Sequence, residues 1–144
     1  MSTIEKAIEI AAREHAGQVD KAGEPYVFHP LRLMLAVSTP LEKMAAVLHD
    51  VVEDTCLSIK DLEAEGFPSE VLDAVNALTK KEGETRIEAA HRAAMDPIAR
   101  VVKLADVTDN MDISRISNPV EKDFARLKEY EEVKELLKSG VVNV

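Results

Sequence analysis

Residues 41–54 read LEKMAAVLHDVVED, an apolar run with helical spacing that ends in six residues carrying one histidine and three acids. The run predicts a helix over residues 40–54, because Thr39 and Pro40 form a typical helix start and Glu42 stands at the capping-box position. Acids that follow a core helix are costly to bury unless they are paired or bound to a metal. This conflict between an apolar pattern and its polar end indicates a functional site.

Similar helix-start signals recur along the rest of the chain, and no strand pattern is evident. Helices are predicted over residues 3–16, 30–37, 40–54, 58–65, 68–79, 85–95, 97–110 and 119–138. The sequence therefore predicts an all-α fold, a compact single-domain bundle of about seven or eight helices. The domain is expected to span residues 1–139, with residues 140–144 as a C-terminal tail.

The composition limits the kinds of partner and cellular compartment that are expected for this chain. The chain has 144 residues, of which 46% are hydrophobic and 31% charged, enough for one domain with its own core. A formal net charge of −9 argues against nucleic acid or a membrane surface as the partner. A single cysteine, Cys56, fits a reducing compartment. With no signal-peptide pattern and no apolar run of about 20 residues, a cytoplasmic protein is expected.

Four polar residues from three separate segments could converge on one ion. They are His29, His49, Asp50 and Asp106. Two imidazoles and two carboxylates form a mixed nitrogen and oxygen ligand set that suits a divalent transition metal. On a continuous helix, Glu53 would lie one turn beyond His49, and Asp54 one turn beyond Asp50. Spare carboxylates beside a metal site are typical of metal-dependent hydrolases.

Plainer interpretations exist for several of these residues. A lone histidine on an apolar face is more often packed in the core than bound to a metal. Lys103, Asp106 and Asp109 could form a solvated stripe on one helix. Structural or solvent-exposed roles are favoured for a further group of polar residues, although a basic lip around the site or closure over a nucleotide is the alternative for most of them. This group contains His15, Lys80, Lys81, Arg86, His91, Arg126 and Tyr130.

Taken together, the motifs resemble those of the HD-domain phosphohydrolases, in particular the RelA/SpoT-type (p)ppGpp hydrolases and their small alarmone hydrolase relatives. The resemblance is carried by AREHAGQ at 12–18, GEPY at 23–26 with His29-Pro30, LHDVVEDT at 48–55, LTK at 78–80, and VKLAD at 102–106 with Asn110-Met111. A histidine–aspartate pair alone would be a weak signal, whereas these motifs span most of the chain.

The resemblance implies an HD-type fold and a Mn²⁺ ion, with other divalent transition metals as alternatives. The implied metal ligands are His29, His49, Asp50 and Asp106. The implied reaction is hydrolysis of the 3′-pyrophosphate of guanosine tetra- or pentaphosphate, with Glu53 and Asp54 positioning and deprotonating the attacking water. The chemistry is consistent, since a metal acidifies its bound water and a nearby carboxylate can accept the proton.

Three further residues are expected at the substrate. Asn110 shares a helix face with Asp106 and could hydrogen-bond the nucleotide sugar. Lys21 stands next to the position where the family carries a basic residue that helps to hold the guanine nucleotide. For Tyr26, contact with substrate and packing on its loop remain equal alternatives.

Five positions depart from the family pattern: Asp20, Val107, Asp109, Asp112 and Ile113. The three acids among them replace neutral or basic residues near the expected phosphates. Two unit charges ~4 Å apart interact by ~4 kcal/mol at an effective dielectric of 20, so each acid could weaken polyphosphate binding.

We therefore expect a working hydrolase whose substrate could be another nucleotide, such as NADPH. The alternatives are a non-catalytic nucleotide-sensing or partner-binding module and a structural bundle with a vestigial ion. A homodimer through an apolar helix face stays open.

Overall fold

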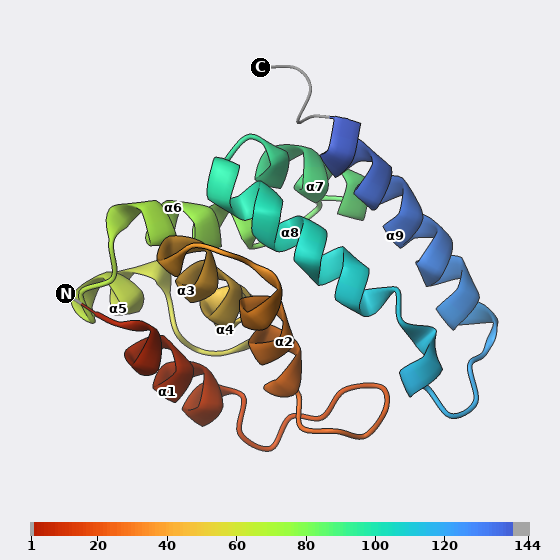
Figure 1. The fold of residues 1–144 in the computed structure, drawn as a ribbon, viewed down its shortest axis with the longest axis horizontal. Coiled ribbons are helices and arrows are strands. Elements are labelled where there is room, and N and C mark those ends of the chain that lie inside the picture. Colours follow the sequence, from red (N-terminus) through yellow and green to blue (C-terminus); the bar gives the residue numbers. More distant parts are fainter. Residues whose placement is uncertain (1, 140–144) are drawn as a thin grey trace.

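The computed structural model describes residues 2–139, except for the side chain of Ser139, so the expected tail at 140–144 lies outside the described residues. Over this range the chain forms nine α-helices and one 3-10 helix, and apart from one isolated bridge it contains no β-structure (Figure 1). The helices are α1 (Ile4–Glu14), α2 (Phe28–Ala36), α3 (Pro40–Leu48), α4 (Val51–Asp54), α5 (Ile59–Ala64), α6 (Ser69–Leu78), α7 (Arg86–Ala94), α8 (Pro97–Asn110), η1 (Ile113–Arg115) and α9 (Glu121–Ser139). The all-α prediction is confirmed.

The predicted continuous helix over residues 40–54 is wrong in one respect. Helix α3 ends at Leu48 and the single-turn helix α4 begins at Val51. The His49 ring explains the break, because its Nδ1 atom lies 2.7 Å from the carbonyl oxygen of Ala46. In a continuous helix that carbonyl would accept from the amide of Asp50. The two residues between the helices are therefore free to turn their side chains toward a common point.

Helix α3 is the centre of the larger hydrophobic core. Its five residues Met44–Leu48 are all buried, and the helix packs against α1, α2, α6 and α8. Such complete burial explains why the sequence of α3 is almost uninterrupted in its apolar character. The Thr39 cap is formed as expected, with its hydroxyl oxygen accepting from the amide of Glu42 and the Glu42 side chain accepting in return. The capped start and the buried end fix the position of α3, and with it the position of His49 directly after the helix.

Helix α8 forms the wall between two cores, and Figure 1 shows it crossing the molecule between α3 and α9. Ala99 and Val102 of α8 belong to the core around α3. Val107 instead packs with Val133 and Leu137 of α9 in a smaller cluster. Asp106 thus lies at the junction of the two cores. No helix within residues 2–139 combines the length and apolar composition that a bilayer span requires.

The burial of Val107 explains one departure from the family pattern. Its side chain is 1% exposed, so a basic residue at this position would place a charge in the cluster with α9. We expect Val107→Arg to lower the free energy of unfolding by about 3 kcal/mol or more, because an unpaired charge is buried. Urea denaturation would measure the loss, with Thr108→Arg on the exposed neighbouring position as control. Equal stability of the two variants would contradict the packing described for Val107.

Candidate metal centre

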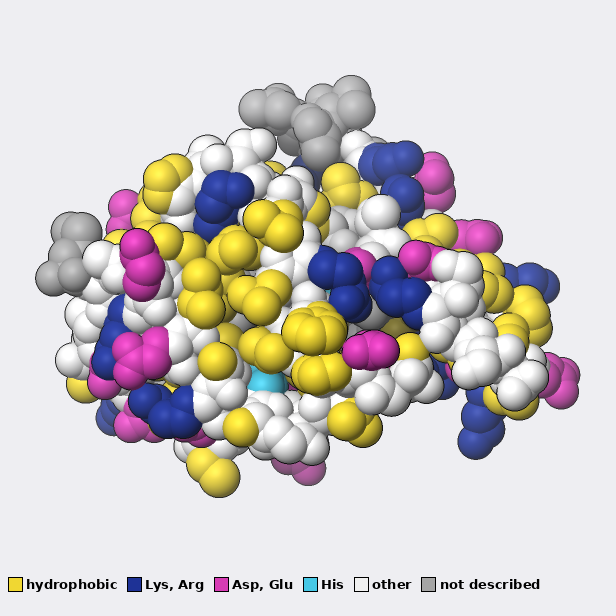
Figure 2. Space-filling view, turned by 60° about the horizontal axis from the view of Figure 1, so that its bottom comes forward, with side chains coloured by type: hydrophobic (Ala, Val, Ile, Leu, Met, Phe, Trp, Pro, Cys, Tyr) yellow, Lys and Arg dark blue, Asp and Glu magenta, His cyan; other side chains and the backbone are white. Residues whose placement is uncertain are grey.

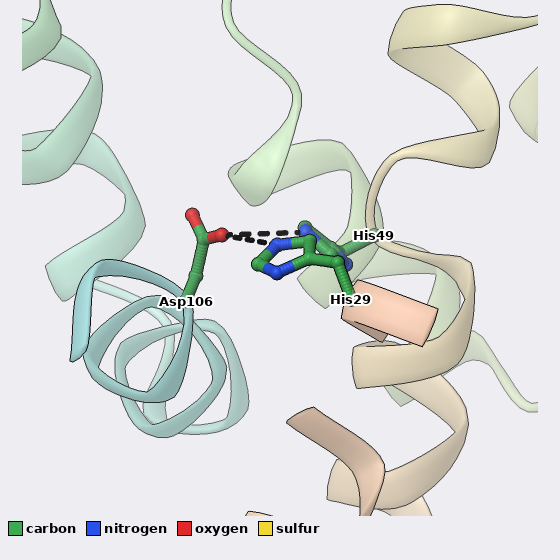
Figure 3. Close-up of side chains that lie close together, drawn as sticks. All are labelled: His29, His49 and Asp106. Carbon is green, nitrogen blue, oxygen red and sulfur yellow. Dashed lines mark hydrogen bonds and ion pairs between the residues drawn. The ribbon is translucent and has the colours of Figure 1, made fainter. Parts of the chain in front are cut away.

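Two histidines and one aspartate from three helical segments meet at a single point. His29 lies in the first turn of α2, which begins two residues earlier than predicted, His49 follows α3, and Asp106 lies on α8. One ligand atom from each of these residues lies within 4.8 Å of the other two, and all three residues are buried. Figure 3 shows the two rings next to each other, with the Asp106 carboxylate reaching toward them from α8. We call these three residues the His/Asp cluster.

The orientation of His29 is fixed from both sides of its ring. Its Nε2 atom lies 2.8 Å from Oδ1 of Asp106, inside the cluster. Its Nδ1 atom lies 2.7 Å from Oδ2 of Asp109. The Asp109 carboxylate also accepts from Arg32, whose Nε atom donates to Oδ1 at 2.9 Å and whose Nη2 atom donates to Oδ2 at 3.0 Å. A carboxylate on the far nitrogen is typical of metal-binding histidines. That Asp109 lies near the phosphates stays a prediction, but its carboxylate is already engaged by His29 and Arg32.

His49 carries the clearest indication that the cluster is built for a cation. Its Nδ1 atom is occupied by the Ala46 carbonyl, so a neutral ring presents the lone pair of Nε2. That buried Nε2 atom has no hydrogen bond of acceptable geometry. It lies 2.9 Å from Oδ2 of Asp50 and 3.6 Å from Oδ1 of Asp106. Acceptors that converge in this way repel one another unless a proton or a metal ion lies between them.

Asp50, the fourth expected ligand, borders the His/Asp cluster. Besides its approach to His49, its Oδ2 atom accepts a hydrogen bond from the hydroxyl of Tyr26. Burial and the neighbouring Asp50 raise the pKa of Tyr26, so its hydroxyl remains a donor at neutral pH. The Tyr26 ring lies between His15 and His29, with centroids 5.1 and 5.8 Å away. Tyr26 thus packs on its loop and orients an expected ligand at the same time.

The electrostatics of the cluster favour positive charge. Burial opposes protonation of both rings, yet the surrounding carboxylates raise the pKa of His29 and hold the pKa of His49 well above its ordinary value. Burial disfavours the charged form of Asp106 too, but Lys103, 3.1 Å away, and the two histidines hold its pKa well below the usual range. A divalent cation would replace the protons on the rings.

Glu53 and Asp54, the expected catalytic carboxylates, line the same cavity as the His/Asp cluster. This metal-side cavity has a volume of about 320 Å³, and Glu53 and Asp54 line it together with the four expected ligands. Glu53 is held in place, because its Oε1 atom lies 2.6 Å from the backbone amide of Lys80. Burial, followed by the charges of Asp50 and Glu53, raises the pKa of Asp54 to about 6. Such a shift suits a group that accepts protons near neutral pH.

A second cavity of about 480 Å³, which we call the outer cavity, adjoins the first. Tyr26, His29, Asn110 and Tyr130 line both cavities. Lys21 lines the outer cavity, so all three expected substrate residues are found there. Asn110 also reaches the cluster, with its Nδ2 atom donating to Oδ1 of Asp106 at 3.2 Å.

Some cavity residues were assigned plainer roles from the sequence. Lys80 and Arg86 line the metal-side cavity, and Arg126 and Tyr130 line the outer one. The guanidinium of Arg86 stacks over the Tyr130 ring, 4.8 Å from its centroid. Helix α9 carries charged residues around most of its circumference, so its sequence gives no sign of which face meets a cavity.

Two other histidines were assigned structural or exposed roles, which stay predictions. His15 is buried against Tyr26, and His91 is exposed.

Comparison with known proteins identifies the family. Residues 9–111 match the model of the HD domain. The chain is 35% identical to a probable GTP pyrophosphokinase of Mycobacterium leprae, an alignment that covers 92% of this chain and 18% of that protein. It is 34% identical to a guanosine-3′,5′-bis(diphosphate) 3′-pyrophosphohydrolase of Spiroplasma citri, over 77% of this chain and 17% of that protein.

Among solved structures, a metazoan ortholog of SpoT that hydrolyzes ppGpp matches with a TM-score of 0.77 and 25% identity. That match covers 93% of this chain and 84% of the metazoan protein. The chain spans less than a fifth of the two bacterial relatives, at 18% and 17% of their lengths, so it corresponds to one part of them. The matched residues include both histidines of the cluster and Asp106, and by this match the chain belongs to the HD-domain family.

Proposed function

We propose that this chain is a metal-dependent phosphohydrolase that removes the 3′-pyrophosphate from guanosine 3′,5′-bis(diphosphate) or a closely related nucleotide. The observation that carries the proposal is the convergence of the His/Asp cluster and two spare carboxylates in one cavity. The names of the Spiroplasma relative and the metazoan structure support the choice of nucleotide. Enzymes of this chemistry need a cation, a proton acceptor and a place for phosphates.

The proposed cation is Mn²⁺, held by His29, His49, Asp50 and Asp106. The donor set fits, since it offers two imidazole nitrogens and two carboxylates, with the buried Nε2 atom of His49 aimed at the shared point. A divalent ion bound there would acidify a water molecule and polarise a phosphoryl oxygen. Asp109 would keep the His29 ring in its position through Nδ1.

Asp54 is proposed as the proton acceptor. No described residue hydrogen-bonds its carboxylate, which lines the metal-side cavity and has a pKa of about 6. General bases work best when their pKa lies near the operating pH. Glu53 is already bound to the Lys80 amide, so its proposed role is to position the water and the loop that carries Lys80.

Phosphate oxygens would lie against the basic side chains of the metal-side cavity. Lys80, Arg86 and Lys103 line it, but four carboxylates line it as well. These are Asp50, Glu53, Asp54 and Asp106. The three basic side chains do not outnumber the four carboxylates, so phosphate binding depends on positive charge at the His/Asp cluster. A divalent cation held there would supply two such charges, and the proposed ion would therefore serve binding as well as chemistry.

The test is turnover by the purified protein across a panel of nucleotides. The panel contains guanosine 3′,5′-bis(diphosphate), other nucleoside polyphosphates and NADPH, each with Mn²⁺. We expect release of pyrophosphate from the first compound, loss of this activity on chelation, and recovery when Mn²⁺ is restored. Inactivity of the metal-loaded protein toward every compound would reject the proposal. Tight binding without product would instead support a nucleotide-sensing module.

A further inference from the structure

The two histidine rings of the His/Asp cluster are supported from behind in different ways. The Nδ1 atom of His49 meets the backbone carbonyl of Ala46, which lies within helix α3. The Nδ1 atom of His29 instead meets Oδ2 of the Asp109 side chain at 2.7 Å. A carbonyl and an ionised carboxylate can only accept, so Nδ1 carries the proton in both rings. A neutral ring then offers the lone pair of Nε2 to the cluster.

The Asp109 carboxylate has a freedom of movement that the Ala46 carbonyl lacks. Its side chain turns about two bonds, whereas the carbonyl belongs to the backbone of a buried helix. Asp109 also lines a third cavity, of about 450 Å³, whose walls come mainly from α2 and α8. Solvent in this cavity would compete with His29 for the carboxylate oxygens. The contact with the His29 ring therefore needs a further restraint on Asp109.

Arg32 supplies this restraint from α2. Its Nε atom donates to Oδ1 of Asp109 at 2.9 Å, and its Nη2 atom donates to Oδ2 at 3.0 Å. A guanidinium that binds both oxygens fixes the orientation of a carboxylate, which a single contact does not. Oδ2 is also the oxygen that meets the His29 ring, so the guanidinium and the imidazole share one acceptor atom.

Arg115 contacts the same carboxylate in another way. Its Nη2 atom lies 3.3 Å from Oδ1 of Asp109 and donates to the backbone carbonyl oxygen of Asp109 at 2.6 Å. Its Nη1 atom donates to Asp112 at 2.9 Å. The ion pair of Arg115 with Asp109 is therefore with Oδ1, not with the oxygen at the His29 ring. Figure 2 shows pairing of this kind on the face that it draws, where Lys and Arg side chains lie directly beside Asp and Glu side chains.

We propose that Arg32 is a positioning residue of the metal centre. It fixes the Asp109 carboxylate, and Asp109 in turn holds the His29 ring with Nε2 toward the ion. This inference rests on the metal centre of the proposed function. Asp109 is one of the positions that depart from the family pattern, so this support is a feature of the present chain. A plainer role for the Arg32–Asp109 pair is to tie α2 to α8, and the two roles differ in their effect on metal affinity.

The sign of one measured change separates these roles. The measurement is the Mn²⁺ dissociation constant of metal-free protein, obtained by isothermal titration calorimetry. Arg32→Gln removes a positive charge close to the proposed ion, and electrostatics alone would then strengthen Mn²⁺ binding. The positioning role predicts the opposite, a dissociation constant raised by about fivefold, because the ring loses part of its support. An unchanged or lowered dissociation constant would overturn the inference.

A double variant tests whether Arg32 acts through Asp109. Removal of a carboxylate behind a metal-binding histidine costs about 10- to 100-fold in metal affinity, and this loss is expected for Asp109→Asn. The variant that combines Arg32→Gln with Asp109→Asn should bind Mn²⁺ no more weakly than Asp109→Asn alone, because Arg32 then has no carboxylate to position. Losses that multiply in the double variant would contradict the proposed route.

Two further variants serve as controls. Arg32→Lys guards against a folding defect in Arg32→Gln, since lysine keeps the charge but cannot hold both oxygens in a fixed orientation; it should weaken Mn²⁺ binding as well. Arg115→Gln removes the same charge from the walls of the same two cavities. Its Mn²⁺ dissociation constant should stay within about twofold of the wild-type value. Equal weakening by Arg115→Gln and Arg32→Gln would contradict the specific role of Arg32.

Turnover of guanosine 3′,5′-bis(diphosphate), measured on the same samples, separates this inference from the proposed function. If the wild type binds Mn²⁺ but hydrolyses no nucleotide, the proposed function fails, while the Mn²⁺ dissociation constants of the variants still decide the inference. If the nucleotide is hydrolysed and Arg32→Gln binds Mn²⁺ as tightly as the wild type, the proposed function stands and the inference fails. A wild type that binds no divalent ion would overturn both.

Discussion

Asp106→Asn is expected to lower kcat/KM by about a thousandfold, the equivalent of several kcal/mol of stabilisation by a divalent ion. Asp106 is the member of the His/Asp cluster that both rings approach, with its Oδ1 atom 2.8 Å from Nε2 of His29 and 3.6 Å from Nε2 of His49. Asparagine keeps the shape of the side chain but removes its charge. The three remaining proposed ligands should bind a divalent ion only weakly.

Metal content and turnover should be lost together in this variant. The metal per chain, measured by elemental analysis after dialysis, should fall from about one to near zero. The metal-free variant should also melt at a lower temperature than metal-free wild type, because the half-buried Lys103 loses its charged partner. Asp73→Asn on the exposed face of α6 is the matched control. A variant that retains one tightly bound ion and turnover within tenfold of wild type would show that Asp106 is not a ligand.

The fold was predictable because its determinants are local. Helix α3 has a capping box, a proline at its first position and a fully buried apolar run, and each of these is visible in the sequence. Its end was not predictable, since the break depends on the His49 ring taking the Ala46 carbonyl. Side chains that compete with the backbone for a carbonyl leave no trace in hydrophobic periodicity.

Within the candidate site, sequence reasoning identified the residues whose polar side chains interrupt an apolar pattern. His29, His49 and Asp106 were found this way, and the structure places them within reach of one ion. For Arg126 and Tyr130 it offered closure over a nucleotide only as the alternative to a structural or exposed role. It could not decide between the two, because the charges of α9 lie around most of its circumference and its neighbours in space are far away in sequence.

Charge pairing was equally invisible in the sequence. Asp109 was interpreted as a repulsive charge near the substrate, yet its carboxylate contacts Arg32 and the Nδ1 atom of His29. Residue type alone does not reveal whether a carboxylate faces a ligand or a guanidinium, and the sign of its effect on an anionic substrate depends on that difference.

Asp54→Asn is expected to lower kcat by about 10²- to 10⁴-fold, the usual contribution of general acid–base catalysis, while metal content stays near wild type. Glu53→Gln is the informative comparison, because glutamine can still accept from the Lys80 amide and the residue is not the proposed proton acceptor. Its effect on kcat should be at least tenfold smaller than that of Asp54→Asn. An equal loss of kcat in the two variants would contradict the proposal that Asp54 accepts the proton while Glu53 positions the water.

The pH dependence provides an independent test of the same residue. The pKa of Asp54 is raised to about 6, so the carboxylate is in its proton-accepting form above that pH and loses it as the pH falls. A bound cation lowers this pKa, and kcat/KM of the wild type should therefore fall with a midpoint at or below about 6. This fall in kcat/KM at low pH should be absent from the residual activity of Asp54→Asn.

The raised pKa also predicts the effect of Asp54→Asn on stability. An acid whose folded pKa of about 6 exceeds its unfolded value near 3.8 destabilises the folded state once it is ionised. Stability contributed by its protonated form is present at low pH and is lost as the pH rises through this window. Asp54→Asn should therefore melt at a higher temperature than wild type at pH 7 in the absence of metal, and the difference should vanish below about pH 4. If Asp54 instead stabilised the fold, Asp54→Asn would lower the melting temperature. A lower melting temperature at pH 7 would therefore argue against a proton acceptor that is retained at a cost in stability.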